Sequence, residues 1–328
     1  MEEAPTYEVF RRHNSEKVGR LVARRAIKGM DYQELREAFS QVAKPSEVKG
    51  DFISMRVSDE HINRLIASDP DSLTERDFEG YVGEVVSYEP GGPDHYVYLL
   101  PTMLRIWAEC LCESETAFNA YLNCDLAREK ILDSYLSPEL RNAVTKFMCS
   151  ALSRRIAKED SLRVTGASQS HEWCDQLNSF GVISSSLPEL WSTVWDVAEA
   201  GHACAVVQFA SCLVFKGEQN PIFDTWTPYL GGGPFELWEY DSMGFDECWL
   251  PSNVKFLRET LSVPYLFDRL ARISQLYPNS PLQRKAWSIW TGVKLHSQRV
   301  DERCTALASA LESPSDDDFI DWSTFGAH

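Results

Sequence analysis

The sequence predicts an all-α protein, and three observations support that prediction. Apolar residues recur at helical spacing through most of the chain, helix-capping residues flank these segments, and the alternation typical of strands is weak. In the clearest segment, 137–157, Ser137 can cap, Pro138 suits the first helical position and Glu139 complements the helix N-terminus. We therefore expect an irregular multi-helix bundle or a stack of helix pairs.

The same periodicity predicts most of the remaining helices. They are expected over 6–28, 31–43, 58–67, 74–88, 94–112, 116–132, 187–199, 202–215, 252–276, 283–296 and 299–312. The helix over 252–276 should break near Pro264, because proline lacks a backbone donor and clashes with the preceding turn. Two short stretches, 53–57 and 181–184, alternate like strands but have no identifiable partner strand.

Length and composition are those of a globular chain. The 328 residues are 44% hydrophobic and 25% charged, enough for one large domain or two ordinary ones. We divide the chain into an N-terminal helical half, 1–157, and a C-terminal helical half, 171–312. An acidic-aromatic tail, 313–328, follows, and a long aromatic and acidic loop spans 216–250.

The charge balance bears on the choice of partner. The chain carries 32 Lys and Arg against 49 Asp and Glu, a formal net charge of −17. Such a surface repels phosphate backbones and anionic lipids, so we expect neither nucleic acid nor a membrane as partner. A basic protein is the better candidate.

The cysteines indicate a compartment. There are nine, an odd number, and they form no compact framework. The N-terminus lacks the apolar region of a signal peptide, and the longest apolar run, 202–215, is too short to span a bilayer. We expect a soluble, cytoplasmic protein with reduced thiols.

Zinc is one chemistry to consider. His171 and Cys174 lie in HEWC, and His202 and Cys204 lie in GHAC, so the ligand types suit zinc. The spacings H-x-x-C and H-x-C match no common zinc pattern, and buried cysteine often acts as a small hydrophobe. We predict no bound metal or cofactor.

Catalytic motifs are weak. No nucleophile elbow occurs, and the three glycines at 231–233 are followed by Pro-Phe-Glu instead of the Gly-Lys-Ser/Thr of a phosphate loop. His95, His171 and His202 are the histidines worth testing as bases. Carboxylates within 236–247 leave open an enzyme that uses paired acids.

Segment 224–247 is the candidate binding site. It interleaves six acidic residues with six aromatic ones, a mixture suited to a basic partner, because aromatics supply contact area and carboxylates speed the encounter. A self-packed loop without a binding role is the alternative. The residues we assign to the partner are Trp238, Glu239, Tyr240, Asp241, Phe245 and Asp246.

A short stretch resembles a known group. Residues 78–109 contain Tyr98-Leu-Leu-Pro-Thr-Met-Leu104, which is similar to an aromatic-Leu-Pro-Arg signature in uncharacterised bacterial helical proteins. Thr102 stands where that signature has its basic residue. The resemblance implies a helical bacterial fold and no particular activity.

Three functions follow from these patterns. The leading hypothesis is a non-catalytic interaction protein with an acidic surface, for example an immunity protein that neutralises a toxin. The second is an enzyme that uses carboxylates around 236–247. The third is a helical array whose groove binds peptides.

Overall fold

A computed structural model describes residues 29–48, 57–83, 94–113, 117–128, 130–163, 172–215, 220–222 and 248–312. Within these ranges the chain forms thirteen α-helices and three 3-10 helices, and none of the described residues belongs to a strand. The all-α prediction is therefore confirmed. Among the same residues no helix is both long enough and apolar enough to cross a membrane.

Ten of these elements precede residue 184. They are α2 (Tyr32–Ala38), η2 (Phe39–Gln41), α3 (Asp59–Ala67), η3 (Pro70–Ser72), η4 (Glu75–Phe78), α4 (Asp94–Glu113), α5 (Ala117–Arg128), α6 (Ile131–Ser134), α7 (Pro138–Ile156) and α8 (Glu172–Ile183). The remaining six are α9 (Leu187–Val194), α10 (Ala200–Val214), α12 (Pro251–Thr260), α13 (Val263–Leu276), α14 (Pro281–Leu295) and α15 (Ser297–Glu312).

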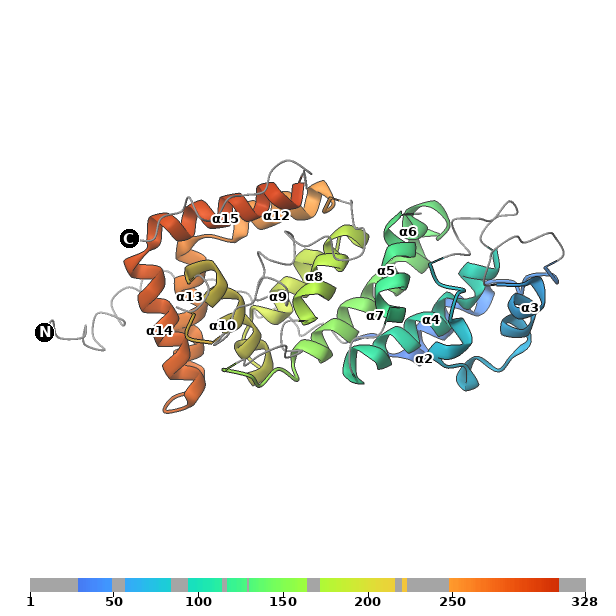
Figure 1. The fold of residues 1–328 in the computed structure, drawn as a ribbon, viewed down its shortest axis with the longest axis horizontal. Helices are drawn as coiled ribbons and strands as arrows, with labels where there is room; N and C mark the ends of the chain where they lie inside the picture. Colours follow the sequence, from blue (N-terminus) through green and yellow to red (C-terminus); the bar gives the residue numbers. More distant parts are fainter. Residues whose placement is uncertain are drawn as a thin grey trace, which may run out of the picture.

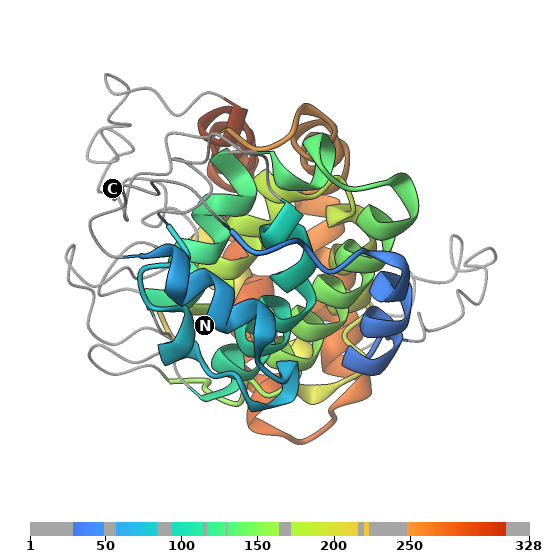
Figure 2. The same cartoon turned by 90° about the vertical axis from the view of Figure 1, so that its right-hand side faces the viewer.

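The helices form an elongated array that follows chain order (Figure 1). The α2, α3 and α4 helices lie towards one end, α7 lies in the middle, and the α13–α14 hairpin forms the other end. Along one edge α12 and α15 lie side by side. Figure 2 looks along the array from the α3 end, with the later helices behind. Segments distant in sequence are therefore also distant in space at the two ends.

Local sequence explains where several helices begin. The Ser137 hydroxyl accepts from the Leu140 amide at 3.3 Å, and Pro138 is the first residue of α7. The expected break near Pro264 separates α12 from α13, with proline in the first turn of α13. Both features were predicted, because capping and proline chemistry act over a few residues.

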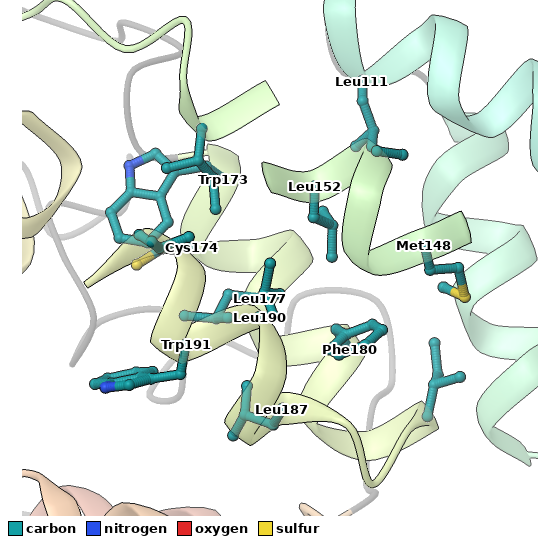
Figure 3. Close-up of a cluster of buried hydrophobic side chains, with 14 of the residues drawn as sticks. Leu111, Met148, Leu152, Trp173, Cys174, Leu177, Phe180, Leu187, Leu190 and Trp191 are labelled. Atoms are coloured by element: carbon teal, nitrogen blue, oxygen red, sulfur yellow. The ribbon is translucent and has the colours of Figure 1, made fainter. Parts of the chain in front are cut away.

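One hydrophobic core runs through both parts of the array. Every residue of α10 from Gly201 to Val214 is buried, in agreement with the apolar run at 202–215. Figure 3 shows the junction of α7, α8 and α9, where Met148 and Leu152 of α7 face Leu177 and Phe180 of α8. The division at 158–170 stays a prediction.

Two local predictions were wrong. Residues 181–183 belong to α8, not to a strand, because Trp173, Leu177 and Phe180 place the segment within a helical apolar stripe. The helix expected over 74–88 is only a 3-10 helix, η4, followed by turns to residue 83. The positive φ angles of Gly80 (77°) and Gly83 (86°) interrupt a right-handed helix at these positions.

Candidate functional site

The predicted binding segment lies outside the described residues. This holds for all six residues assigned to it, namely Trp238, Glu239, Tyr240, Asp241, Phe245 and Asp246. The described chain ends at Ile222 on one side of the segment and resumes at Cys248 on the other. The two flanks therefore define where the segment is attached.

The N-terminal flank is fixed to α10 and α14. The Asn220 amide donates to the Ser211 hydroxyl at 3.1 Å, and its carbonyl oxygen accepts from the Ile222 backbone amide at 2.9 Å. The Lys285 ammonium of α14 donates to the Pro221 carbonyl oxygen. These bonds hold the chain against the helical array where the segment begins.

The C-terminal flank is fixed to α8 and α15. Trp249 is buried, its backbone amide donates to the Leu311 carbonyl oxygen at 2.9 Å, and its indole N–H donates to Asn178. Its ring lies over Gly181, where an added Cβ would be 2.4 Å from Trp249 Cε2. The described residues on either side of 223–247 are thus anchored separately, one flank to α10 and α14 and the other to α8 and α15.

Of the four residues considered as zinc ligands, His202 and Cys204 make hydrogen bonds within the core. His202 Nε2 lies 2.9 Å from the Ser153 carbonyl oxygen, and the Cys204 thiol donates to the Ser161 carbonyl oxygen at 3.4 Å. Burial raises the pKa of Cys204 to about 12, which disfavours the thiolate that binds zinc. Within the described ranges no three His, Cys, Asp or Glu side chains are arranged to hold a metal, and His171 lies outside them.

His95, considered as a base, belongs to a buried network. Its Nδ1 lies 2.9 Å from the Tyr81 hydroxyl. Beside it Asp125 accepts from the Tyr96 hydroxyl at 3.1 Å and from the Gly83 amide at 2.9 Å. Burial, then the Asp125 charge, raises the pKa of Tyr96 well above its ordinary value. The network connects the turn at 79–83 to α4 and α5. It could not be predicted from a local sequence pattern, because its members come from separate segments of the chain.

The α3 end of the molecule is strongly acidic. Residues 57–83, which we call the acidic end, contain seven Asp and Glu against two Arg. Glu60, Asp69, Asp71 and Glu79 are exposed. The His61 ring lies 2.9 Å from the Asp77 carbonyl oxygen and thereby holds α3 against η4. The carboxylates of α3 and η4 therefore lie at the same end of the array.

Arg105 of α4 anchors the backbone of the acidic end to α4. Its guanidinium donates to the carbonyl oxygens of Leu73 at 2.6 Å and Pro70 at 3.3 Å, and it pairs with Glu109 at 2.7 Å. The Arg105 side chain is only 15% exposed. On the same side Arg36 pairs with Asp71 at 3.0 Å. The contacts of Arg105 and Arg36 therefore hold the acidic turns in place. A loop of the same composition without such tertiary contacts would open more readily.

A stretch rich in Lys and Arg lies at the opposite end of the described array. From residue 269 to residue 300 the chain carries six Lys and Arg and no Asp or Glu, in a protein of net charge −17. This stretch covers most of α13 and all of α14. Two of its cations neutralise the end of α9, where Arg269 donates to the Trp195 carbonyl oxygen and Arg272 pairs with Asp196. Counting charged residues segment by segment, instead of over the whole chain, would have identified both the acidic end and this basic stretch from the sequence.

Comparison with known proteins adds no relative. No protein-family model, no curated protein and no solved structure matches the chain. The resemblance of residues 78–109 to bacterial helical proteins stays a prediction.

Proposed function

We propose that this chain is a non-catalytic protein-binding scaffold whose acidic surface engages a basic partner. The observation that carries the proposal is the segregation of charge between the two ends of an elongated array. Carboxylates gathered on one fixed surface create a local field that attracts a cationic partner and speeds its association. A neutralising protein for a toxin with a basic active-site face is one form of this function.

The acidic end and segment 224–247 have separable roles in this proposal. The acidic end, anchored by Arg105, supplies long-range attraction. The aromatic residues of the segment, Trp238 foremost, supply the short-range contact that slows dissociation. The division predicts that charge changes alter the association rate and that loss of an aromatic alters the dissociation rate.

A basic peptide of ten arginines is a suitable probe for the acidic end. The double variant Glu60→Gln/Glu79→Gln removes two exposed carboxylates from that surface. Its matched control, Glu259→Gln/Glu302→Gln, makes the same charge change on exposed residues of α12 and α15. Stopped-flow association at low salt should slow several-fold in the first variant only. An equal effect in both would mean that only total charge matters, and would refute a localised site.

Trp238→Ala tests the aromatic contact. If Trp238 is an interface anchor, the variant should lose ~2 kcal/mol of binding to the partner and melt like the wild type. If Trp238 is a core residue, the variant should lose ~3–5 kcal/mol of stability instead. A thermal melt alone separates these results, and a large fall in melting temperature would remove Trp238 from the binding surface.

A further inference from the structure

Helix α5 buries two amide side chains that lie one helical turn apart. Asn119 and Asn123 are each only 1% exposed, in a helix of 12 residues. Asparagine is mostly found at protein surfaces, and where it is buried its donors and acceptors are usually paired. The hydrogen-bond partners of these two amides therefore indicate whether something else is bound beside them.

Asn123 is paired through its nitrogen only. Its Nδ2 donates to the Gln176 Oε1 atom of α8 at 3.0 Å. Its Oδ1 atom is buried and accepts no hydrogen bond from any described residue. The contact between α5 and α8 thus contains a polar bond with one acceptor left over.

Asn119 is unpaired at both polar atoms. Among the described residues it is the only side chain with two buried polar atoms that lack a hydrogen-bond partner, Nδ2 and Oδ1. Exchanging the nitrogen and the oxygen of its amide does not change this result, because both positions lack a partner. Leaving such atoms unsatisfied is more unfavourable than an ordinary hydrogen bond is favourable.

The spacing of the two residues suits a bridging ligand. Residues four positions apart lie on the same face of a helix, with Cβ atoms roughly 5–6 Å from each other. Asn119 and Asn123 make no direct bond with each other. One water molecule that makes two hydrogen bonds of about 2.9 Å joins polar atoms that are roughly 4.5–5 Å apart.

The unsatisfied atoms also determine the chemistry of the ligand. They are one donor group, Asn119 Nδ2, and two acceptors, the Oδ1 atoms of Asn119 and Asn123. A metal cation or an ammonium ion could serve only the acceptors, and a carboxylate could serve only the donor. Water both donates and accepts, and a buried water typically makes about three hydrogen bonds.

We propose that Asn119 and Asn123 bind one buried water molecule, which accepts from Asn119 Nδ2 and donates to Asn123 Oδ1. The water extends the bond between Asn123 and Gln176 into a continuous polar link from α5 to α8. A fully satisfied polar link inside a core favours a single relative arrangement of the helices that it joins. The water is therefore a structural component of the contact between α5 and α8.

The side-chain amide protons of Asn119 report directly on the bound water. In NMR spectra of the full-length chain they should show a dipolar cross-peak to water. Gln208 is the control within the same protein, because it is only 2% exposed and its amide is fully paired with Trp173, Glu159 and Ser161. A cross-peak at Asn119 and none at Gln208 is expected. The absence of a cross-peak at Asn119 would overturn the proposal.

A count of long-lived waters by oxygen-17 relaxation dispersion tests the site with a variant. Asn119→Leu removes both polar atoms and fills the site with apolar volume, so the count should fall by one. Asn142→Leu, at an exposed position of α7, makes the same replacement away from the site and should leave the count unchanged. An equal count in Asn119→Leu and the wild type would overturn the proposal. If Asn119→Leu does not fold, the cross-peak in the wild type still decides the question.

Discussion

The contact between α7 and α10 provides a direct test of the packing. Gly201 lies in the first turn of α10 and touches the end of α7. A Cβ added at Gly201 would lie 1.9 Å from the Ala157 carbonyl oxygen and 2.2 Å from its carbonyl carbon. Both atoms are backbone, so no side chain can move aside to make room, and Gly201→Ala must push the two helices apart.

The size of the effect can be estimated. Replacing glycine by alanine within a helix ordinarily stabilises it by up to about 1 kcal/mol. Overpacking a core costs ~1–3 kcal/mol, and the upper end applies here because α10 is buried along its whole length. A net loss of ~2–3 kcal/mol corresponds to a fall in melting temperature of roughly 5 °C for a chain of this size.

The assay is thermal and urea unfolding followed by far-UV circular dichroism. Gly292→Ala in α14 is the matched control, because its added Cβ would meet side chains, Val214 and Phe215, each at 2.7 Å. These side chains can shift in part, and the gain in helix propensity offsets some of the cost, so we expect a smaller loss. A Gly201→Ala variant as stable as the wild type would refute the close approach of α7 and α10.

Three further outcomes are expected. Arg105→Ala should lower the free energy of unfolding by ~2–3 kcal/mol, because two carbonyl oxygens lose their donor. Amide hydrogen exchange in segment 69–79 should rise above that of other loops. Unchanged exchange there would contradict the anchoring role of Arg105. Iodoacetamide should alkylate the exposed Cys248 well before the buried Cys204, because burial raises the pKa of the Cys204 thiol to about 12. Equal alkylation rates in mass spectrometry would contradict the burial of Cys204. Burial raises the pKa of Glu159 above its ordinary 4.5, so its contribution to stability is greatest below pH 4.5 and falls as the pH rises through the pKa of the folded state. Glu159→Gln should therefore flatten the fall of the urea midpoint with rising pH. An unaltered pH profile would mean that another group causes the fall.

Helices whose determinants are local could be predicted from the sequence. Ser137 caps α7 and the Pro264 turn separates α12 from α13, because each effect depends on residues within one turn. The start of α8 was not predicted. Its apolar stripe is diluted by Gln176, whose buried amide accepts from Asn123 of α5 at 3.0 Å. A polar side chain satisfied only by a distant helix lowers the apolar periodicity on which the prediction rests.

The candidate surfaces were harder to predict than the fold. Total charge indicated an acidic protein, but averaging over the chain concealed the basic stretch between 269 and 300. The anchoring of the acidic end depends on Arg105, which is about thirty residues from the carbonyl oxygens it binds. Such a bond leaves no local pattern, since the arginine lies within α4 and its acceptors are backbone atoms of any residue type.

The two ends of the array have a linked electrostatic consequence. The field of the described array is polar, with exposed carboxylates such as Glu60 at the α3 end and the Lys- and Arg-rich stretch 269–300 at the other end. A basic partner at the acidic end is then oriented as well as attracted, because its approach to the other end is repelled. Added salt should weaken the attraction and the orientation of the partner together, because it screens both ends of the array.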